Sequence, residues 1–296
     1  KSLTKIVKPT EIFITNIQHT HLENFKSTKN IAKEKSDIFV SKYNNLREKL
    51  YLNITNNSER ILLNRANKEE KLSVIHINKL SKKYYIKNIS RKKNNYQVDF
   101  SINKKIQTIE TKLPINFRLI NLLFCYAFFD QNLIDINVIK NTFKYLKPVD
   151  GRGLIHNIQI KKIKLKVIDE SYNANPDTMH QSLNYFNDIK LSNIKKILIL
   201  GNMNELGRNS IKMHLKILRQ IEKHSFKFVI LCGEFFRRSI IKLKKPHNEF
   251  IYLDNKNEIM TFLSKNIKKN DMIMIKCSNS TETNIFAKNL LKKEVI

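Results

Sequence analysis

The segment over residues 166–183, KVIDESYNANPDTMHQSL, stands out from the lysine-, asparagine- and isoleucine-rich sequence around it. An Asn-Pro pair near its middle is a favourable N-cap and first residue of a helix, so free backbone N–H groups are expected to face a ligand bound there. A capped strand-to-helix turn explains that pair completely. It leaves four residues unexplained, and these make the turn a candidate ligand site: Asp169, Glu170, Tyr172 and Asn173.

The elements that must position this turn alternate between strand and helix through the second half of the chain. Short apolar runs predict strands, and the residues between them show helical spacing. Strands separated by single helices imply right-handed crossovers and a mostly parallel sheet, with ligands beyond the carboxyl ends of its strands. We expect strands at 163–168, 196–201, 227–232 and 271–276, and helices at 177–189, 209–223, 235–244, 256–267 and 281–293.

The first half of the chain has a different rhythm. The run EIFITNI, residues 11–17, predicts a buried strand whose tip carries His19 and His21. The turn-rich segment PVDGRG, residues 148–153, predicts a domain boundary, which gives domains over 1–150 and 151–296. Between these landmarks we expect a helix at 28–50, a meander of modest strands at 59–112, and helices at 115–131 and 135–146.

Net charge is the most extreme bulk property. The chain has 55 basic and 26 acidic residues, giving +29, which is a signature of nucleic-acid binding. However, the lysines form short pairs along the whole chain, without zinc-finger spacing or an aromatic-interleaved RNA-binding segment. A coding bias toward Lys, Asn and Ile produces the same excess, so we expect no nucleic-acid partner.

Cysteine usage and hydropathy indicate a soluble cytoplasmic protein. The three cysteines, Cys125, Cys232 and Cys277, have no paired spacing, so neither a disulfide framework nor a thiolate zinc site is expected. Apolar residues make up 41% of the chain, and no apolar run approaches the roughly 18 residues of a membrane span. The first residue is lysine and no signal pattern follows, which suggests a fragment or a processed chain.

The run DESYNANP resembles the D-D-S-Y-N-A-N-P motif of the Mur ligase family, in the branch that adds D-alanyl-D-alanine. Four more segments resemble family motifs in the family's order. Each motif is weak alone, but the ordered set is specific and spans nearly the whole chain. These segments are TNIQHTHLENFKS (15–27, resembling T-N-I-G-x-x-H-L-E-x-F-G-S), IAKEKSDIF (31–39, V-A-x-A-K-x-E-I-F), PVDGR (148–152, P-V-x-G-R) and LGNMNELG (200–207, L-G-D-M-x-E-L-G).

The resemblance implies a fold and a reaction. It implies the carboxyl-terminal part of the family's central ATP-binding domain over 1–150 and a Rossmann-like ligase domain over 151–296. The implied enzyme is an ATP-dependent amide ligase of peptidoglycan synthesis that joins UDP-N-acetylmuramoyl-tripeptide to D-alanyl-D-alanine through an acyl phosphate. Mg²⁺ is the expected cofactor beside ATP, because it neutralises crowded phosphate charge. The complete enzyme is expected to be a cytoplasmic monomer.

The resemblance also assigns two residues to a metal site. His21 matches a strand-end histidine that helps to hold the second magnesium ion, and Lys35 matches a lysine that is carbamylated by carbon dioxide. Carbamylation turns a cationic arm into an anionic oxygen ligand of the kind a hard cation prefers. Taken alone, His21 is more typical of a structural histidine and Lys35 of a solvated helix charge, and the ordered motifs favour the functional interpretation.

Three further residues match nucleotide-binding positions of the family. Arg152 matches an arginine on the phosphates, Glu170 an acid on the ribose, and Asn121 an asparagine near the adenine. A planar guanidinium suits phosphate oxygens. Five residues are expected at the dipeptide side of the cleft: Tyr172, Asn173, Asn175, and, after the last strand, Lys276 and Ser278.

This sequence departs from the family most clearly at the phosphate-binding loop. A Gly-x-x-Gly-Lys-Thr loop lets backbone N–H groups cradle phosphates, but none of the five glycines here precedes a lysine. The chain alone is therefore not expected to hydrolyse ATP. Other family positions are altered too, with Gln18 for a glycine, Thr55 for an acid, Asn202 for an aspartate, Asn279 for an arginine and residues 115–118 for G-R-H-N.

Two other interpretations stay open. The chain could be an inactive or split remnant that acts only with a partner chain supplying the phosphate-binding loop. It could also be a basic nucleic-acid-binding protein. Within the superfamily, a folate polyglutamate-adding enzyme is the nearest neighbour, and the SYNANP run argues against it.

Overall fold

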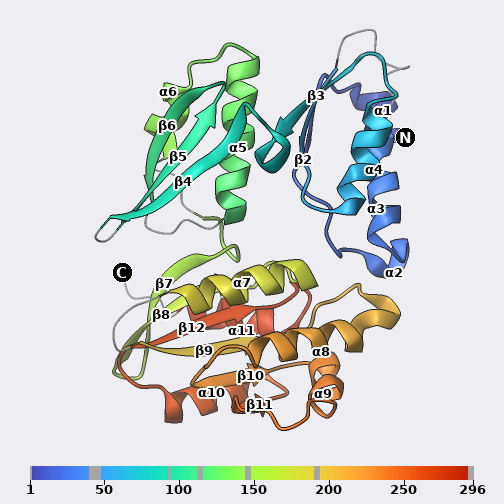
Figure 1. The fold of residues 1–296 in the computed structure, drawn as a ribbon. Helices are drawn as coiled ribbons and strands as arrows, with labels where there is room; N and C mark the ends of the chain where they lie inside the picture. The colour runs from blue at the N-terminus through green and yellow to red at the C-terminus, as the bar shows by residue number, and fades with distance from the viewer. Residues whose placement is uncertain are drawn as a thin grey trace. The chain divides into compact units, whose positions relative to one another are not determined.

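The computed structural model describes residues 2–39, 48–92, 95–111, 116–143, 148–189 and 194–292. The chain divides into two compact units (Figure 1). Lys1–Gln18 and Ser27–Leu146 make up the first, and His19–Lys26 and Lys147–Ile296 make up the second. The division at 150 and 151, with its assignment of ATP-binding and ligase domains, stays a prediction, and it did not foresee that residues 19–26 group with the second unit.

A three-stranded parallel sheet organises the amino-terminal part of the first unit. Its order is β1-β2-β3, with β1 at Glu11–Ile14, β2 at Glu48–Asn53 and β3 at Leu72–Ile77. Three consecutive residues of β2, residues 50–52, are fully buried, as expected of a central parallel strand covered on both faces. The helical segments here are α1 (Ser2–Val7), α3 (Thr28–Lys35), the 3₁₀ turn η1 (Ser36–Phe39) and α4 (Asn57–Ala66).

An antiparallel meander follows in the same unit and confirms the prediction from residue 84 onward. The strands β4 (Tyr84–Lys92), β5 (Asn95–Ile102) and β6 (Lys105–Thr111) follow the 3₁₀ turn η3 (Asn78–Leu80). Helix α5 (Asn116–Gln131) packs on the meander, with Tyr126 against Phe100 at 5.4 Å between ring centroids. Helix α6 (Asn137–Phe143) contributes Ile139 to the same core.

Two predictions for the first unit were wrong. Residues 59–66 belong to helix α4, because Asn56 and Glu59 form a capping box that starts a helix at Asn57. The apolar residues here recur at helical spacing, with Leu62 and Ala66 buried on one face. The helix predicted over 28–50 was also wrong at its end, since residues 48–50 open strand β2.

The second unit is built on a six-stranded, mostly parallel sheet, as predicted. Its order is β11-β10-β9-β12-β8-β7, and the pairing of β7 with β8 is antiparallel. The strands are β7 (Leu154–Ile160), β8 (Ile163–Glu170), β9 (Lys195–Leu200), β10 (Phe228–Leu231), β11 (Phe250–Tyr252) and β12 (Asp271–Lys276). The sequence did not predict β7 or β11. The helical segments are α2 (Leu22–Phe25), α7 (Pro176–Asp188), the 3₁₀ turn η4 (Gly207–Asn209), α8 (Ser210–Ile221), α9 (Glu234–Ile240), α10 (Lys256–Asn266) and α11 (Glu282–Leu291).

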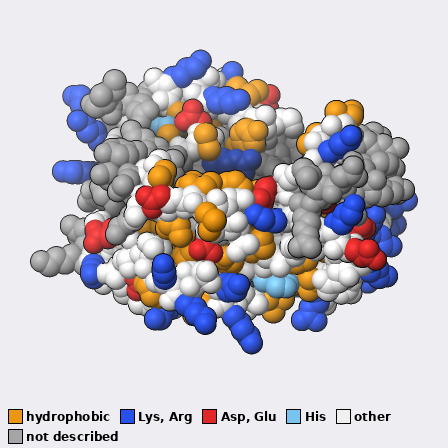
Figure 2. Space-filling model, turned by 90° about the horizontal axis from the view of Figure 1, so that it is seen from above, with side chains coloured by type: hydrophobic (Ala, Val, Ile, Leu, Met, Phe, Trp, Pro, Cys, Tyr) orange, Lys and Arg blue, Asp and Glu red, His pale blue; other side chains and the backbone are white. Residues whose placement is uncertain are grey.

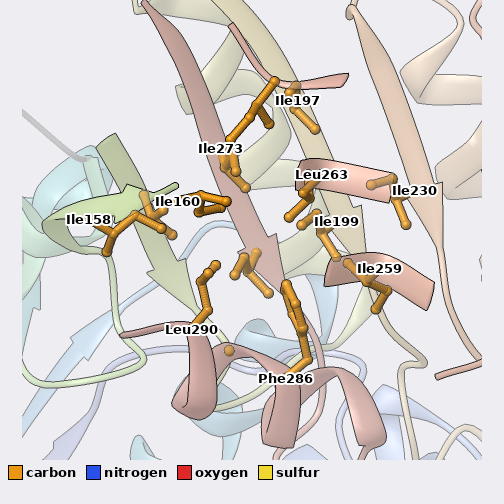
Figure 3. Packing of buried hydrophobic residues seen from close by; sticks show 14 of the residues in the cluster. Ile158, Ile160, Ile197, Ile199, Ile230, Ile259, Leu263, Ile273, Phe286 and Leu290 are labelled. Atoms are coloured by element: carbon orange, nitrogen blue, oxygen red, sulfur yellow. The ribbon is translucent and has the colours of Figure 1, made fainter. Parts of the chain in front are cut away.

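The sheet of this unit is covered by an apolar core, which fixes the strand ends that carry the site. On one face, Ile197, Ile199 and Ile273 pack with Leu263 of α10 and Phe286 of α11 (Figure 3). Successive side chains of a strand point to opposite faces, so the residues between these supply the apolar surface for helices on the other side. Complete burial of one such side chain contributes about 1.5–3 kcal/mol.

The strand order brings three strand ends together. β12 is the last strand in sequence, yet it lies between β8 and β9. The chain therefore runs outward from β9 to β11 and returns to the middle of the sheet, which creates a topological switch point where ligands characteristically bind. The candidate site lies at this edge.

Surface charge is dispersed. On the face shown in Figure 2, Lys and Arg side chains are spread among acidic, apolar and neutral atoms and do not form one continuous patch. Among the described residues, no helix has the length and apolar character needed to span a bilayer.

Candidate functional site

Asp169, at the end of β8, fixes the turn that carries the candidate residues. Its side chain is buried and accepts hydrogen bonds from the backbone N–H of Gly151 (2.9 Å) and from both the N–H (3.0 Å) and hydroxyl (2.6 Å) of Ser171. Gly151 has φ +70°, and a Cβ there would lie 2.7 Å from the Cβ of Tyr172. Glycine is required at this position, since the PVDGRG turn packs directly on the segment after β8.

Glu170 and Lys276 form a buried ion pair on the neighbouring strands β8 and β12. The Lys276 ammonium donates to Glu170 Oε2 at 3.3 Å and to the backbone oxygen of Asn173 at 3.1 Å. Burial lowers the pKa of Lys276, while Glu170 acts in the opposite direction and raises it. Through its bond to the Asn173 oxygen, Lys276 fixes the backbone of the turn after β8. Its buried ammonium therefore lies under the residues of that turn that were predicted to meet substrate.

Asn175 starts helix α7 as predicted. Its side-chain oxygen accepts from the N–H of Thr178 at 2.9 Å, and the Thr178 hydroxyl accepts from the Asn175 N–H at 3.1 Å. Asn175 is only 4% exposed, and its side-chain oxygen takes part in the helix cap. Tyr172 and Asn173 are exposed by contrast.

A pocket of about 290 Å³ opens at this edge of the second unit. The segment after β8 forms one wall, the loop after β9 another, and the loop after β12 a third, with Thr20 and His21 completing it. Ser278 joins the walls, because its hydroxyl donates to the Ala174 oxygen (3.3 Å) and accepts from the Asn204 N–H (2.9 Å). The other lining residues are Tyr172, Asn173, Asn175, Glu205, Asn279 and Ser280.

Arg152 lies beside this pocket on the face of an aromatic ring. Its guanidinium carbon is 4.5 Å from the ring centroid of Tyr172, which is within cation–π range. Both side chains are exposed. The arrangement presents a planar cation at the surface, a geometry that suits oxyanions.

A buried histidine supports the loop after β9. His214 of α8 is fully buried, and its Nε2 accepts the Met203 N–H at 3.0 Å while Nδ1 lies 2.7 Å from the Ser210 oxygen. Burial lowers the pKa of His214 to about 4, so the ring is neutral near pH 7. The neutral tautomer with Nδ1 protonated satisfies both bonds.

The segment over residues 19–26 carries two histidines that contact carboxylates of the second unit. The ring of His19 bonds to Asp177 Oδ2 at 2.8 Å, and this hydrogen bond raises the pKa of His19 while burial opposes it. Burial would raise the pKa of Asp177, but its bonds to His19 outweigh that effect and lower it. His21 Nδ1 contacts the Glu205 carboxylate.

The remaining predicted residues lie in the first unit. Lys35, at the end of α3, is exposed, and its ammonium donates to the Asn16 oxygen at 3.3 Å. Partial desolvation lowers the pKa of Lys35, and Glu59 opposes this shift. Asn121 is an exposed residue of α5. The residues 115–118, predicted to replace an adenine motif, lie partly outside the described residues.

The described residues contain no cluster of three or more His, Cys, Asp or Glu able to hold a metal ion. Mg²⁺ rarely needs one, since it is commonly held by one or two side chains together with substrate phosphates and water. Contact of His21 Nδ1 with the Glu205 carboxylate leaves Nε2 as the ring nitrogen that faces an ion, and metal-binding histidines commonly bond to a carboxylate through their other ring nitrogen. The donor set therefore fits an ion that is bound mainly by a phosphorylated ligand.

Sequence reasoning missed four residues that shape the site. Asp169 was noticed but given no role, and Asp177, Glu205 and His214 were not singled out. Asp177 directly follows the DESYNANP motif and Glu205 lies inside the LGNMNELG segment, so their positions in the sequence were available signals. The histidine carried no signal, because a lone histidine on an apolar helix face is usually structural.

Two family models match different parts of the chain. The family described as Mur ligase middle domain matches residues 1–129, and the one described as Mur ligase, glutamate ligase domain matches residues 158–279. Together these two ranges cover most of the chain.

Curated relatives match over nearly the full length of the chain. One is the UDP-N-acetylmuramoyl-tripeptide--D-alanyl-D-alanine ligase of Rickettsia prowazekii, 30% identical over 95% of this chain and 61% of that protein. Another carries the same name in Buchnera aphidicola subsp. Baizongia pistaciae, 27% identical over 98% of this chain and 60% of that protein. The chain thus spans about three-fifths of the length of these relatives.

Solved structures show the same fold. MurF from Acinetobacter baumannii matches with a TM-score of 0.80 at 17% identity, over 98% of this chain and 61% of that one. MurF ligase from Thermotoga maritima in complex with ADP matches with a TM-score of 0.78 at 19% identity, over 98% of this chain and 64% of that one. The two family matches, which together cover most of the chain, establish that the chain belongs to the Mur ligase family.

Proposed function

We propose that this protein is an ATP-dependent ligase that joins D-alanyl-D-alanine to UDP-N-acetylmuramoyl-tripeptide in peptidoglycan synthesis. The observation that carries the proposal is the pocket at the switch point, whose walls come from the segments that resemble the motifs of this branch. The names of the curated relatives support the same activity. We further propose that the protein acts in the cytoplasm as a monomer when complete.

The second unit would bind the nucleotide and the incoming dipeptide. Arg152, stacked on Tyr172, offers a planar cation to phosphate oxygens, and Glu170 offers a carboxylate beside the same turn. Glu170 is paired with Lys276, so only part of its hydrogen-bonding capacity remains for a ribose. We assign Tyr172, Asn173 and Ser278 to the dipeptide side.

Lys276 and Asn175 take indirect roles in this proposal. Lys276 is 2% exposed and holds the backbone oxygen of Asn173, so it would orient the turn. Asn175 would act through the cap of α7. Neither side chain needs to touch the dipeptide for the turn to be formed correctly.

The first unit would supply groups for the phosphorylated end of the acceptor. A lysine must lose its proton before it can react with carbon dioxide, and desolvation lowers the pKa of Lys35 toward that condition. Carbamylated Lys35 and His21 are the residues we propose to hold Mg²⁺, which would neutralise phosphate charge. Asn121 would lie near the adenine.

The reaction also needs a phosphate-binding loop, which these 296 residues do not contain. In our proposal it comes from residues outside this sequence, on the same polypeptide or on a partner chain. A carboxylate of the tripeptide would take the γ-phosphoryl group of ATP, and the dipeptide amine would then displace phosphate to form the amide. One ADP and one phosphate are released for each amide bond.

The test is a ligation assay with the full-length gene product. Incubation with UDP-N-acetylmuramoyl-tripeptide, ATP, Mg²⁺ and labelled D-alanyl-D-alanine is expected to yield labelled UDP-N-acetylmuramoyl-pentapeptide and an equal amount of ADP. L-alanyl-L-alanine serves as the control substrate. Absence of labelled product from a folded full-length protein contradicts the proposal, and product that forms only after a second polypeptide is added supports the split-chain alternative.

A further inference from the structure

The segment over residues 19–26 joins two stretches of the first unit in sequence, yet it belongs to the second unit. Its own regular structure is limited to the single turn α2, so that turn cannot hold the segment in place. The contacts with the second unit must therefore fix it. Leu22 is buried, and two acidic residues on different elements supply polar contacts.

Asp177, in the first turn of α7, makes the first contact. Its Oδ2 accepts both the backbone N–H of His19 (2.8 Å) and the ring Nδ1–H of the same residue (2.8 Å). Two donors of one residue on one carboxylate oxygen fix both the backbone and the ring of His19. Charge-assisted bonds of this kind are about twice as strong as neutral ones.

Glu205, in the loop after β9, makes the second contact. Its side chain contacts His21 Nδ1, and its backbone oxygen accepts the Glu23 N–H at 3.0 Å. His21 (φ 52°) and Glu205 (φ 62°) are both left-handed, a conformation that costs about 1–2 kcal/mol for a residue other than glycine. Such backbone geometry persists only where surrounding contacts impose it.

A glycine allows segment 19–26 and the residues after the loop that follows β9 to approach closely. Gly207 has φ +56°, and a Cβ built there would lie 3.2 Å from the Cα of Glu23. Neither Asp177 nor His19 lines the pocket, whereas His21 and Glu205 do. Asp177 thus does not line the pocket itself, but it contacts the segment that brings His21 there.

We propose that Asp177 and Glu205 are positioning residues that clamp segment 19–26 to the second unit and set the place of His21 at the pocket. The role of His21 in this inference rests on the proposed function. Displacement of a reacting group by about 1 Å can cost about 100-fold in rate, so such a clamp has a direct chemical consequence. The backbone of the segment is held at His19, whose N–H donates to Asp177.

The alternative is that Asp177 only stabilises α7 as a first-turn acid, through the helix dipole. Hydrogen exchange of the full-length protein separates the two roles. In Asp177→Ala we expect the amides of residues 19–26 to exchange at least about tenfold faster, while those of 180–188 keep their protection. Glu282→Ala, which removes an exposed acid from the first turn of α11, is the matched control and should leave residues 19–26 unchanged.

Two outcomes of that exchange experiment overturn the proposal. Unchanged protection in residues 19–26 would show that Asp177 holds nothing there. An equal loss of protection in 180–188 would assign Asp177 to helix stability alone. Neither outcome depends on ligase activity, so failure of the clamp and failure of the proposed function are distinguishable.

Steady-state kinetics give the second readout. Asp177→Ala is expected to lower kcat about tenfold or more with little change in KM for D-alanyl-D-alanine, because His21 is misplaced while the residues that line the pocket remain. Asp177→Asn keeps an acceptor oxygen for the His19 N–H and should restore part of kcat. A rise in KM at unchanged kcat, or no rescue by asparagine relative to alanine, would contradict the positioning role.

Discussion

Charged side chains near the carboxyl ends of the strands in the two units lie in two different environments. At the ends of β8 and β12, Asp169, Glu170 and Lys276 are nearly inaccessible, and their bonds go to one another or to the turns they support. Beyond the end of β1, Lys35 is exposed and reaches the carbonyl of Asn16. The charged groups at β8 and β12 are buried and fixed, whereas Lys35 beyond β1 is a side chain that solvent and ligands can reach.

This difference separates residues that shape a site from residues that change during a reaction. Burial makes an ion pair costly to break, because the remaining charge has no water to solvate it. An exposed lysine loses little when its charge or its partner changes. We therefore expect substitutions in these two environments to differ in their effect on the free energy of unfolding, and the predictions run from the largest effect to the smallest.

Lys276→Met is expected to lower the free energy of unfolding by about 3–5 kcal/mol, because it leaves the buried Glu170 carboxylate without a partner. The measurement is urea unfolding followed by far-ultraviolet circular dichroism. Lys195→Met, at an exposed position of the neighbouring strand β9, is the control and should change little. In the double variant with Glu170→Gln, the loss should be smaller than in Lys276→Met, and a purely additive result would refute the pairing.

The strand β12 and the start of helix α7, which carry the buried charges and the turn, were predicted well from the sequence. Residues 271–276 and the start of α7 were predicted almost to the residue, since continuous apolar runs and an Asn-Pro helix start are local signals. The ion pair could not be foreseen, because Glu170 and Lys276 are 106 residues apart and the position of β12 between β8 and β9 is a property of the whole sheet.

Family resemblance located candidate residues but not their environments. Lys276 was expected at substrate, and the resemblance did not indicate that its side chain is buried and bonded to Glu170 and to the backbone of the turn. Motif position specifies where a residue stands in the chain. Whether its side chain faces a ligand depends on packing contributed by distant segments, as with Lys276 under the turn after β8.

The second prediction concerns the loss of stability at acid pH that buried His214 is expected to cause. Burial lowers the pKa of His214 to about 4 in the folded protein, against about 6.5 in the unfolded chain. A depressed folded pKa means that the stability from neutral His214 is present above pH 6.5 and is lost as pH falls from 6.5 toward 4. The loss over that window is about 3 kcal/mol, since each pKa unit corresponds to about 1.4 kcal/mol.

The measurement for His214 is the free energy of unfolding at several pH values, for the wild type and for His214→Gln. Glutamine can still accept the Met203 N–H but does not titrate, so the difference between the two proteins should shrink as pH falls from 6.5 toward 4. His180→Gln, at an exposed histidine of α7, is the control. A difference that is constant across this range would show that His214 does not take up a proton on unfolding.

A substitution of Glu59 tests whether a buried carboxylate in the first unit contributes to the free energy of unfolding as the buried charges of the second unit do. Its oxygens accept the N–H groups of Ile17 (3.0 Å) and Asn56 (3.0 Å) and the Thr55 hydroxyl (2.9 Å). Glu59→Gln should cost about 2 kcal/mol, because an amide group then faces backbone donors and the charge-assisted bonds are lost. Urea unfolding measures it, with Glu34→Gln on the exposed face of α3 as control, and equal stability of the two variants would contradict the assignment.

Lys35 should show the smallest effect on stability and the clearest effect on chemistry. Lys35→Ala is expected to change the free energy of unfolding by no more than about 0.5 kcal/mol, since the residue is exposed. Ligation by the full-length protein should nevertheless be lost and should return in part when a short carboxylate is added, because that acid can replace the carbamate oxygen ligands. Lys33→Ala, two residues earlier on the same helix turn, should retain activity. If Lys35→Ala ligates at the wild-type rate, Lys35 holds no metal and has no chemical role. If instead Lys35→Ala unfolds the protein, the contrast between the buried ion pair Glu170–Lys276 and the exposed Lys35 fails.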